Sequence, residues 1–256
     1  MKNRKIPRTK ITQKIFIKNR SLLGKSDKLN QLIEETKLEL SIKIYFDDIR
    51  NHRDNPHLAK HSIVTFNPNE NEEIIYLDPS QVFEDDIAHE LYECRIRKKY
   101  PKLCYKKGTK SSEFLDYVRD YIYSGLIDFE VERLVKMNDF NISNSISRDK
   151  RSMLRDWSSP DPYYDFPFKD NPNWKSLRVV GVGIILSHLY EEMNQAECRL
   201  VEESAKRTIP DALAICHIFL SEAKQEKLDC AEGFSKALED VLQKLKLSEI
   251  FEISKS

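Results

Sequence analysis

The sequence lacks the features of secreted and membrane-spanning proteins. Its five cysteines are an odd number, and no two of them lie close together in the sequence or form a Cys-x-x-Cys motif. Neither a disulfide framework nor a cysteine zinc knuckle is therefore expected. The longest apolar run, residues 179–186, contains two glycines and is far shorter than the roughly 20 residues needed to span a bilayer. The first thirty residues lack the apolar core of a secretory leader. These absences predict a cytoplasmic protein with reduced thiols.

The chain also lacks a net charge, because 42 basic residues balance 42 acidic ones. The charges are unevenly distributed, since residues 1–30 contain ten Lys or Arg residues and a single acid, Asp27. This basic arm could contact nucleic acid or an acidic membrane surface, although a solvated terminus is the more common explanation. A hydrophobic content of 40% is sufficient for a core in one large domain or two small ones.

The first third of the chain has the pattern of a helix followed by a small sheet. Residues 28–38 have apolar side chains at helical spacing, and residues 40–46 alternate between apolar and polar side chains as in a half-buried strand. Residues 62–66 and 74–77 are rich in β-branched side chains and flank an Asn/Pro cluster, which favours a hairpin. A three-stranded sheet is therefore expected.

Next comes the stretch most informative about function, Asp-Ile-Ala-His-Glu-Leu-Tyr-Glu at residues 86–93. A helix is expected from about Ser80 to Pro101, with an apolar stripe through Phe83, Ile87, Leu91 and Cys94. His89 and Glu93 are four residues apart and therefore share a helix face, with Glu90 beside it. A charged helix face is usually just solvated, but these side chains could also share a metal ion.

A second helix, from Ser111 or Ser112 to about Arg133, repeats the arrangement. Asp128 and Glu132 are four residues apart and share a face with Gly125. Because a mid-helix glycine costs about 1 kcal/mol relative to alanine, it indicates close approach of another helix. Two helices that each present acids four residues apart could meet across a metal ion.

The order of these elements resembles that of the gluzincin-type zincin metallopeptidases: strands, then a His-Glu-x-x-Glu helix, then a second helix with acidic residues. By position, His89 matches the first zinc ligand, Glu90 the general base, and Glu93 the second ligand, where the family has histidine. Asp128 matches the third ligand and is shorter than the usual glutamate. Glu132 matches a carboxylate that orients a ligand.

The resemblance covers residues 40–137 and implies a metal-dependent hydrolase, a metallopeptidase acting on a peptide or protein with a metal-activated water. The His/Glu/Asp ligand set implies one divalent ion, zinc first, with manganese or iron as alternatives. A di-iron site is disfavoured because paired Glu-x-x-His motifs are absent. Two histidines on apolar helices, His188 and His217, are left out of the site because such residues usually have structural roles.

The competing hypothesis is a catalytically inactive zincin-like protein that binds a partner or nucleic acid. It depends on the basic arm and on a basic segment between the two motif helices. Tyr100 and Tyr105 lie within that segment and could stack on bases. The basic residues of the segment are Arg95, Arg97, Lys98, Lys99, Lys102, Lys106, Lys107 and Lys110.

After residue 138 the pattern changes. Residues 138–172 are rich in Asn, Ser, Pro and aromatics and are expected to form an irregular loop or lid. From residue 174 onward only helices are expected, at 175–193, 197–207, 210–225 and 230–245. The sequence thus predicts a mainly helical α+β protein with a small N-terminal antiparallel sheet and a C-terminal helical bundle. Its regions are a basic arm (1–30), a zincin-like core (31–138), a loop (139–172) and a helical region (173–256).

Overall fold

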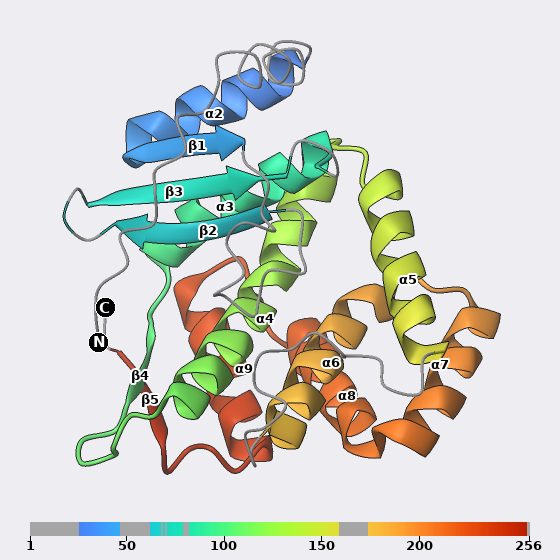
Figure 1. The fold of residues 1–256 in the computed structure, drawn as a ribbon. Helices are drawn as coiled ribbons and strands as arrows, with labels where there is room; N and C mark the ends of the chain where they lie inside the picture. The colour runs from blue at the N-terminus through green and yellow to red at the C-terminus, as the bar shows by residue number, and fades with distance from the viewer. Residues whose placement is uncertain are drawn as a thin grey trace, which may run out of the picture. The chain divides into compact units, whose positions relative to one another are not determined.

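A computed structural model describes residues 26–46, 62–67, 69, 71–78, 82–158 and 174–254 (Figure 1). Eight helices and five short strands occur in these ranges, which confirms a mainly helical α+β fold. Contacts within the chain divide it into two compact units, residues 1–91 and 92–256. The division falls inside helix α3 (Glu84–Lys99), and the helix is continuous there.

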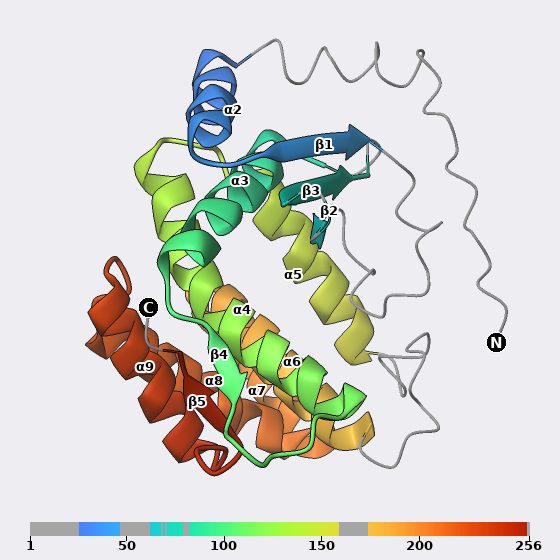
Figure 2. The same cartoon turned by 90° about the vertical axis from the view of Figure 1, so that its left-hand side faces the viewer.

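The first unit begins with helix α2 (Asp27–Glu39), as expected. Ser26 is its N-cap, and the Ser26 hydroxyl accepts a hydrogen bond from the backbone N–H of Leu29 at 3.3 Å. The same hydroxyl donates to Glu84, which ties the start of α2 to the start of α3. Figures 1 and 2 show α2 lying next to strand β1.

A three-stranded sheet contains β1 (Ile42–Phe46), β2 (Ser62–Asn67) and β3 (Glu72–Leu77) in the order β1-β3-β2. The expected hairpin is confirmed, since β2 and β3 are antiparallel and Asn71 in their turn has a left-handed φ of 49°. Strand β1 pairs with β3 in parallel, so this sheet is mixed.

Helix α3 is buried on its apolar stripe as expected, at Ile87, Leu91 and Cys94. The carboxylate of Asp86 accepts a hydrogen bond from the backbone N–H of Phe83 at 2.7 Å, which closes the first turn. The expected N-cap, Ser80, lies outside the described residues. The helix ends at Lys99, shortly before Pro101.

In the second unit, helix α4 (Glu113–Met137) begins after Ser112, whose hydroxyl caps the backbone N–H of Leu115 at 3.3 Å. Strand β4 (Leu103–Tyr105) precedes it and pairs antiparallel with β5 (Phe251–Ile253). The prediction that only helices follow residue 174 was therefore wrong. Strands of three residues leave almost no alternation in the sequence, and their pairing joins distant parts of the chain.

The prediction of an irregular loop at 138–172 was also wrong in part, because Ser143–Ser158 form helix α5. The Asn and Ser residues at its start are poor helix formers and obscured the helical spacing of Ile146, Met153, Leu154 and Trp157 that follows. Contacts with distant residues favour it: Lys150 Nζ donates to the carbonyl of Glu192 at 2.9 Å and lies 2.7 Å from Glu197 Oε2. Residues 159–173 of the expected loop lie outside the described residues.

The remaining helices match their predictions closely and are α6 (Trp174–Tyr190), α7 (Gln195–Thr208), α8 (Pro210–Gln225) and α9 (Ala231–Lys244). Figure 2 shows α4, α6 and α8 grouped in the second unit. Helices α6, α7 and α8 share an apolar core, and no helix in the described part is long and apolar enough to cross a membrane. The core consists of Val182, Leu186, Leu189, Met193, Val201, Ala205, Ile209, Ala212, Leu213, Cys216 and Leu220.

Glycines mark the close helix crossings of this unit. A Cβ atom at Gly125 of α4 would lie 2.6 Å from Ile184 Cγ2 of α6, so the close approach expected at this glycine is confirmed. A Cβ atom at Gly183 of α6 would lie 2.7 Å from the carbonyl oxygen of Ala212 in α8. The crossing at Gly125 packs α4 closely against α6, and α4 carries one of the proposed metal ligands.

Candidate metal centre

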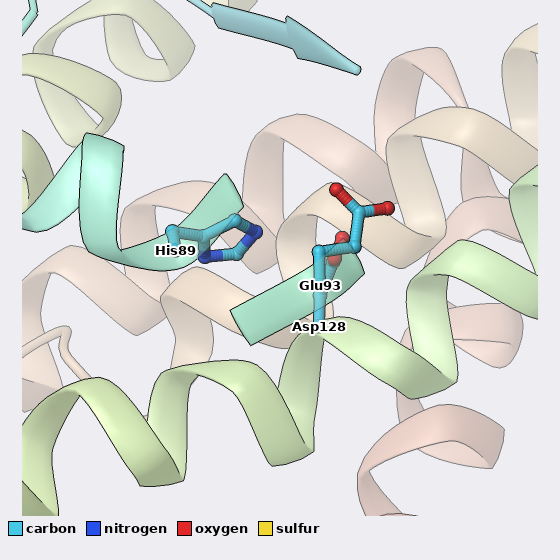
Figure 3. A group of neighbouring side chains, drawn as sticks. All are labelled: His89, Glu93 and Asp128. Carbon is cyan, nitrogen blue, oxygen red and sulfur yellow. The ribbon is translucent and has the colours of Figure 1, made fainter. Parts of the chain in front are cut away.

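The three side chains proposed as metal ligands lie together. One ligand atom each from His89, Glu93 and Asp128 can be chosen so that all three atoms lie within 4.8 Å of one another. Figure 3 shows His89 and Glu93 projecting from α3 and Asp128 from α4. One turn of α3 separates His89 from Glu93, so helix geometry alone places these two side chains together. Asp128 reaches them from the second helix.

The donor atoms suit a divalent cation. Around a tetrahedral zinc ion with bonds of about 2.1 Å, neighbouring ligand atoms lie about 3.4 Å apart, so small side-chain rotations would bring the three atoms into range. One imidazole nitrogen and two carboxylate oxygens form a set that zinc accepts and that manganese and ferrous iron also tolerate. Glu93 is buried, and His89 and Asp128 are half-buried. The arrangement therefore fits an ion in a partly desolvated position.

Arg97 holds one of these ligands. Oxygen Oε1 of Glu93 accepts a hydrogen bond from Arg97 Nε at 2.7 Å and lies 2.5 Å from Arg97 Nη2 in the same ion pair. Arg97 Nη2 also donates to the hydroxyl of Ser124 in α4 at 2.7 Å. Sequence reasoning assigned Arg97 only to a basic segment, although its spacing of four residues from Glu93 is a recognised ion-pair signal.

The charges of Arg97, Glu93 and Asp128 stabilise one another. Desolvation lowers the pKa of the Arg97 guanidinium, but the Glu93 carboxylate, with a smaller contribution from Asp128, raises it above the ordinary value. Arg97 therefore stays charged and offsets part of the negative charge of the two carboxylates.

Tyr123 of α4 covers Arg97, with the guanidinium carbon 6.0 Å from the ring centroid. Its ring meets Phe234 of α9 edge-on at a centroid distance of 5.7 Å. Burial raises the pKa of the Tyr123 phenol to about 12, even though nearby Arg97 lowers it. The buried hydroxyl has no hydrogen-bond partner within the described ranges. Tyr123 thus supplies an apolar wall beside the arginine.

Glu90, the proposed base, has a different environment from the ligands. It is buried, and its Oε1 accepts a hydrogen bond from the hydroxyl of Ser62 in β2 at 2.5 Å. Its carboxylate does not belong to the group of three ligand atoms. Ser62 was not identified from the sequence, because its contact with Glu90 depends on how the sheet meets the helix.

Glu132, expected to orient a ligand, lies beside a histidine that the sequence analysis left out. Glu132 Oε1 is 3.2 Å from His188 Nδ1 of α6. His188 Nε2 donates to the carbonyl oxygen of Gly125 at 2.9 Å, and the His188 ring lies 4.2 Å from that of Phe129. These contacts link α4 to α6, one turn beyond Asp128.

The tyrosines of the basic segment are engaged in packing. Tyr100 is buried, and its hydroxyl donates to the carbonyl of Leu228. Tyr105 donates to Asp116 Oδ1 at 2.9 Å, and its ring contacts both Arg119 and Phe251. The buried Tyr100 ring is not accessible to bases, and the half-buried Tyr105 ring is held by contacts within the protein.

Comparisons with family models, curated proteins and solved structures yield no match to the chain.

Proposed function

We propose that this protein is a metal-dependent hydrolase of the zincin-like metallopeptidase type. The observation that carries the proposal is the convergence of His89, Glu93 and Asp128, one imidazole and two carboxylates from two helices. Their helix positions match the ligand positions of the family that the sequence resembles, with Glu93 in place of a histidine and Asp128 in place of the usual glutamate. Zinc is the first expected ion, and manganese and iron are the alternatives for this oxygen-rich set.

Burial supports a functional role for this face of α3. Glu90 and Glu93 are only 7% and 8% exposed, whereas acids on an ordinary amphipathic helix face water. Burying carboxylates is unfavourable unless partners compensate for the lost hydration. Ser62 and Arg97 compensate in part for Glu90 and Glu93, and a metal ion at His89, Glu93 and Asp128 would add to the compensation for Glu93.

A divalent ion held by three protein groups supplies an acidified water and polarises a carbonyl group. Glu90 is the proton acceptor in the proposal, because it is adjacent to His89 and lies outside the ligand group. Ser62 donates a hydrogen bond to Glu90 Oε1 and so helps to orient this carboxylate. The expected substrate is a peptide or protein.

The competing hypothesis, an inactive zincin-like protein that binds nucleic acid through basic segments, has less support. Arg97 of the basic segment is paired with Glu93, and Tyr100 is buried. Lysines 98, 99, 102, 107 and 110 of the segment are exposed, and residues 1–25 of the basic arm lie outside the described residues. A nucleic-acid titration across salt concentrations tests it, since phosphate contacts give a steep salt dependence.

Metal analysis of protein purified without a metal-affinity tag tests the proposal directly. We expect about one zinc ion per chain in the wild type and in His217→Ala, an exposed histidine of α8, and almost none in His89→Ala. Equal, negligible metal in all three proteins would refute the metal centre.

Glu90→Gln then separates binding from catalysis. It should retain zinc and lose peptide hydrolysis by about 10²-fold or more, because the amide cannot accept the proton. Unchanged turnover would refute the role of Glu90. Zinc binding without any hydrolysis in the wild type would support a structural or binding role for the centre.

A further inference from the structure

Arg97 pairs with Glu93 in an unusual way. Both of its donors, Nε and Nη2, contact the same oxygen, Oε1. Arginine commonly binds a carboxylate with two parallel hydrogen bonds, one to each oxygen. Among the described residues, Arg97 makes no hydrogen bond to Oε2 of Glu93.

A second arginine in the same unit shows the ordinary arrangement. Arg133 of α4 contacts Glu130 with Nε to Oε2 and Nη2 to Oε1, both at 2.6 Å. Both pairs are short-range pairs on a single helix, three or four residues apart. Glu130 belongs to no metal-ligand group in the part of the chain that the structure describes. Of these two pairs, the one in which arginine contacts a single carboxylate oxygen is therefore the pair that contains a proposed metal ligand, Glu93.

The guanidinium of Arg97 is also fixed from the second helix. Ser124, four residues before Asp128, accepts from Nη2 at 2.7 Å, and the Tyr123 ring lies over the guanidinium. Arg97 thus connects the helix of Glu93 with the helix of Asp128, one turn from each ligand. Partners of this kind orient metal ligands and set their charge.

We propose that Arg97 is a positioning residue of the metal centre. It holds Oε1 of Glu93, presents Oε2 as the single coordinating oxygen, and reduces the negative charge of the two-carboxylate site. This inference rests on the proposed function, because it requires that an ion binds at His89, Glu93 and Asp128.

Zinc affinity of the full-length apoprotein, measured by calorimetric titration with zinc chloride, tests the inference. Arg97→Met keeps the length of the apolar stem and removes the hydrogen bonds, and we expect zinc affinity to fall about 10- to 100-fold. Arg97→Lys retains the charge and should recover part of the loss. Ser124→Ala removes only the anchor on α4 and should have a smaller effect than Arg97→Met.

Arg133→Met is the matched control, since it removes an arginine–glutamate pair of the same kind away from the centre. It should leave zinc affinity unchanged. Thermal unfolding of each apoprotein identifies variants that fail to fold, and Arg97→Lys serves if Arg97→Met is one of them. Absorption of the cobalt-substituted proteins reports ligand geometry, and it should change in Arg97→Met and not in Arg133→Met.

The outcomes separate this inference from the function on which it rests. If wild-type protein binds no zinc, the proposed function fails and the inference fails with it. If the wild type binds zinc and Arg97→Met binds equally well, the positioning role is refuted and the metal centre stands. Tighter zinc binding by Arg97→Met would also refute it, because Arg97 would then compete with the ion for Glu93.

Discussion

Helices α3 and α6 are both largely buried, yet they bury opposite kinds of side chain. Helix α3 places Asp85, Asp86, Glu90 and Glu93 below 9% exposure. Helix α6 buries aliphatic residues and approaches its neighbours closely at glycines. Apolar burial stabilises a fold, whereas buried carboxylates lower stability unless each has a partner. Helix α6 therefore contributes mainly apolar burial, whereas the buried acids of α3 depend on specific partners.

Three of the buried acids of α3 have distinct partners. Asp86 accepts from the backbone N–H of Phe83, Glu90 from Ser62, and Glu93 from Arg97. The first closes a helix end, the second holds the proposed base, and the third belongs to the proposed metal centre. One helix thus contains structural and functional acids of the same residue type, which mutations can separate.

The largest expected effect concerns stabilisation by zinc. At a free zinc concentration of 100 times the dissociation constant, binding should raise the free energy of unfolding of the wild type by about 2.7 kcal/mol. Asp128→Asn should lose nearly all of this gain, because the amide is a poor ligand. Urea unfolding with and without zinc chloride measures the difference.

Asp120→Asn is the control for that experiment, because Asp120 is an exposed acid on the same helix that pairs with Arg119 at 2.9 Å. It should keep the full zinc-dependent gain. If both variants kept it, zinc would be bound elsewhere and the functional reading of α3 and α4 would be wrong.

The helix faces that carry the ligands could be predicted because helical spacing is a local property. Residues four apart share a face, so the positions of His89, Glu93 and the Asp128 face followed from the sequence. The mid-helix Gly125 likewise indicated a close helix neighbour. The parallel pairing of β1 with β3 and the antiparallel pairing of β4 with β5 could not be predicted, because both depend on which distant segments meet.

Contacts at the candidate metal centre that join distant segments could not be predicted either. Ser62 approaches Glu90 from a strand, and Ser124 approaches Arg97 from another helix, so neither contact leaves a pattern in the sequence. Helix α5 was missed for a different reason, since the Asn and Ser residues at its start obscured its helical pattern; Lys150 also contacts Glu192 and Glu197.

A second prediction concerns the packing of α6. Gly183→Ala would place a methyl group 2.7 Å from the backbone carbonyl oxygen of Ala212 and from Ile215 Cβ, neither of which can rotate away. We expect the free energy of unfolding to fall by about 1–3 kcal/mol. Urea unfolding of the metal-free protein measures it.

Gly181→Ala, two residues earlier on α6, is the matched control. Its methyl group would lie 3.4 Å from the Tyr121 ring, an ordinary contact, and alanine favours the helix by up to about 1 kcal/mol. We therefore expect Gly181→Ala to be neutral or stabilising. Equal stability losses in both variants would mean that α6 is packed no more tightly against α8 at Gly183 than against Tyr121 at Gly181.

The smallest expected effect separates a structural acid of α3 from the functional ones. Asp86→Ala removes the hydrogen bond to the backbone N–H of Phe83 and should lower the free energy of unfolding by about 1 kcal/mol, with zinc affinity unchanged. Asp86→Glu is the control, because glutamate commonly fills this reciprocal position at a helix start, and it should retain most of the stability. A loss of zinc affinity in Asp86→Ala comparable to that of Arg97→Met would show that the metal centre extends to the first turn of α3, and the distinction between its structural and functional acids would fail.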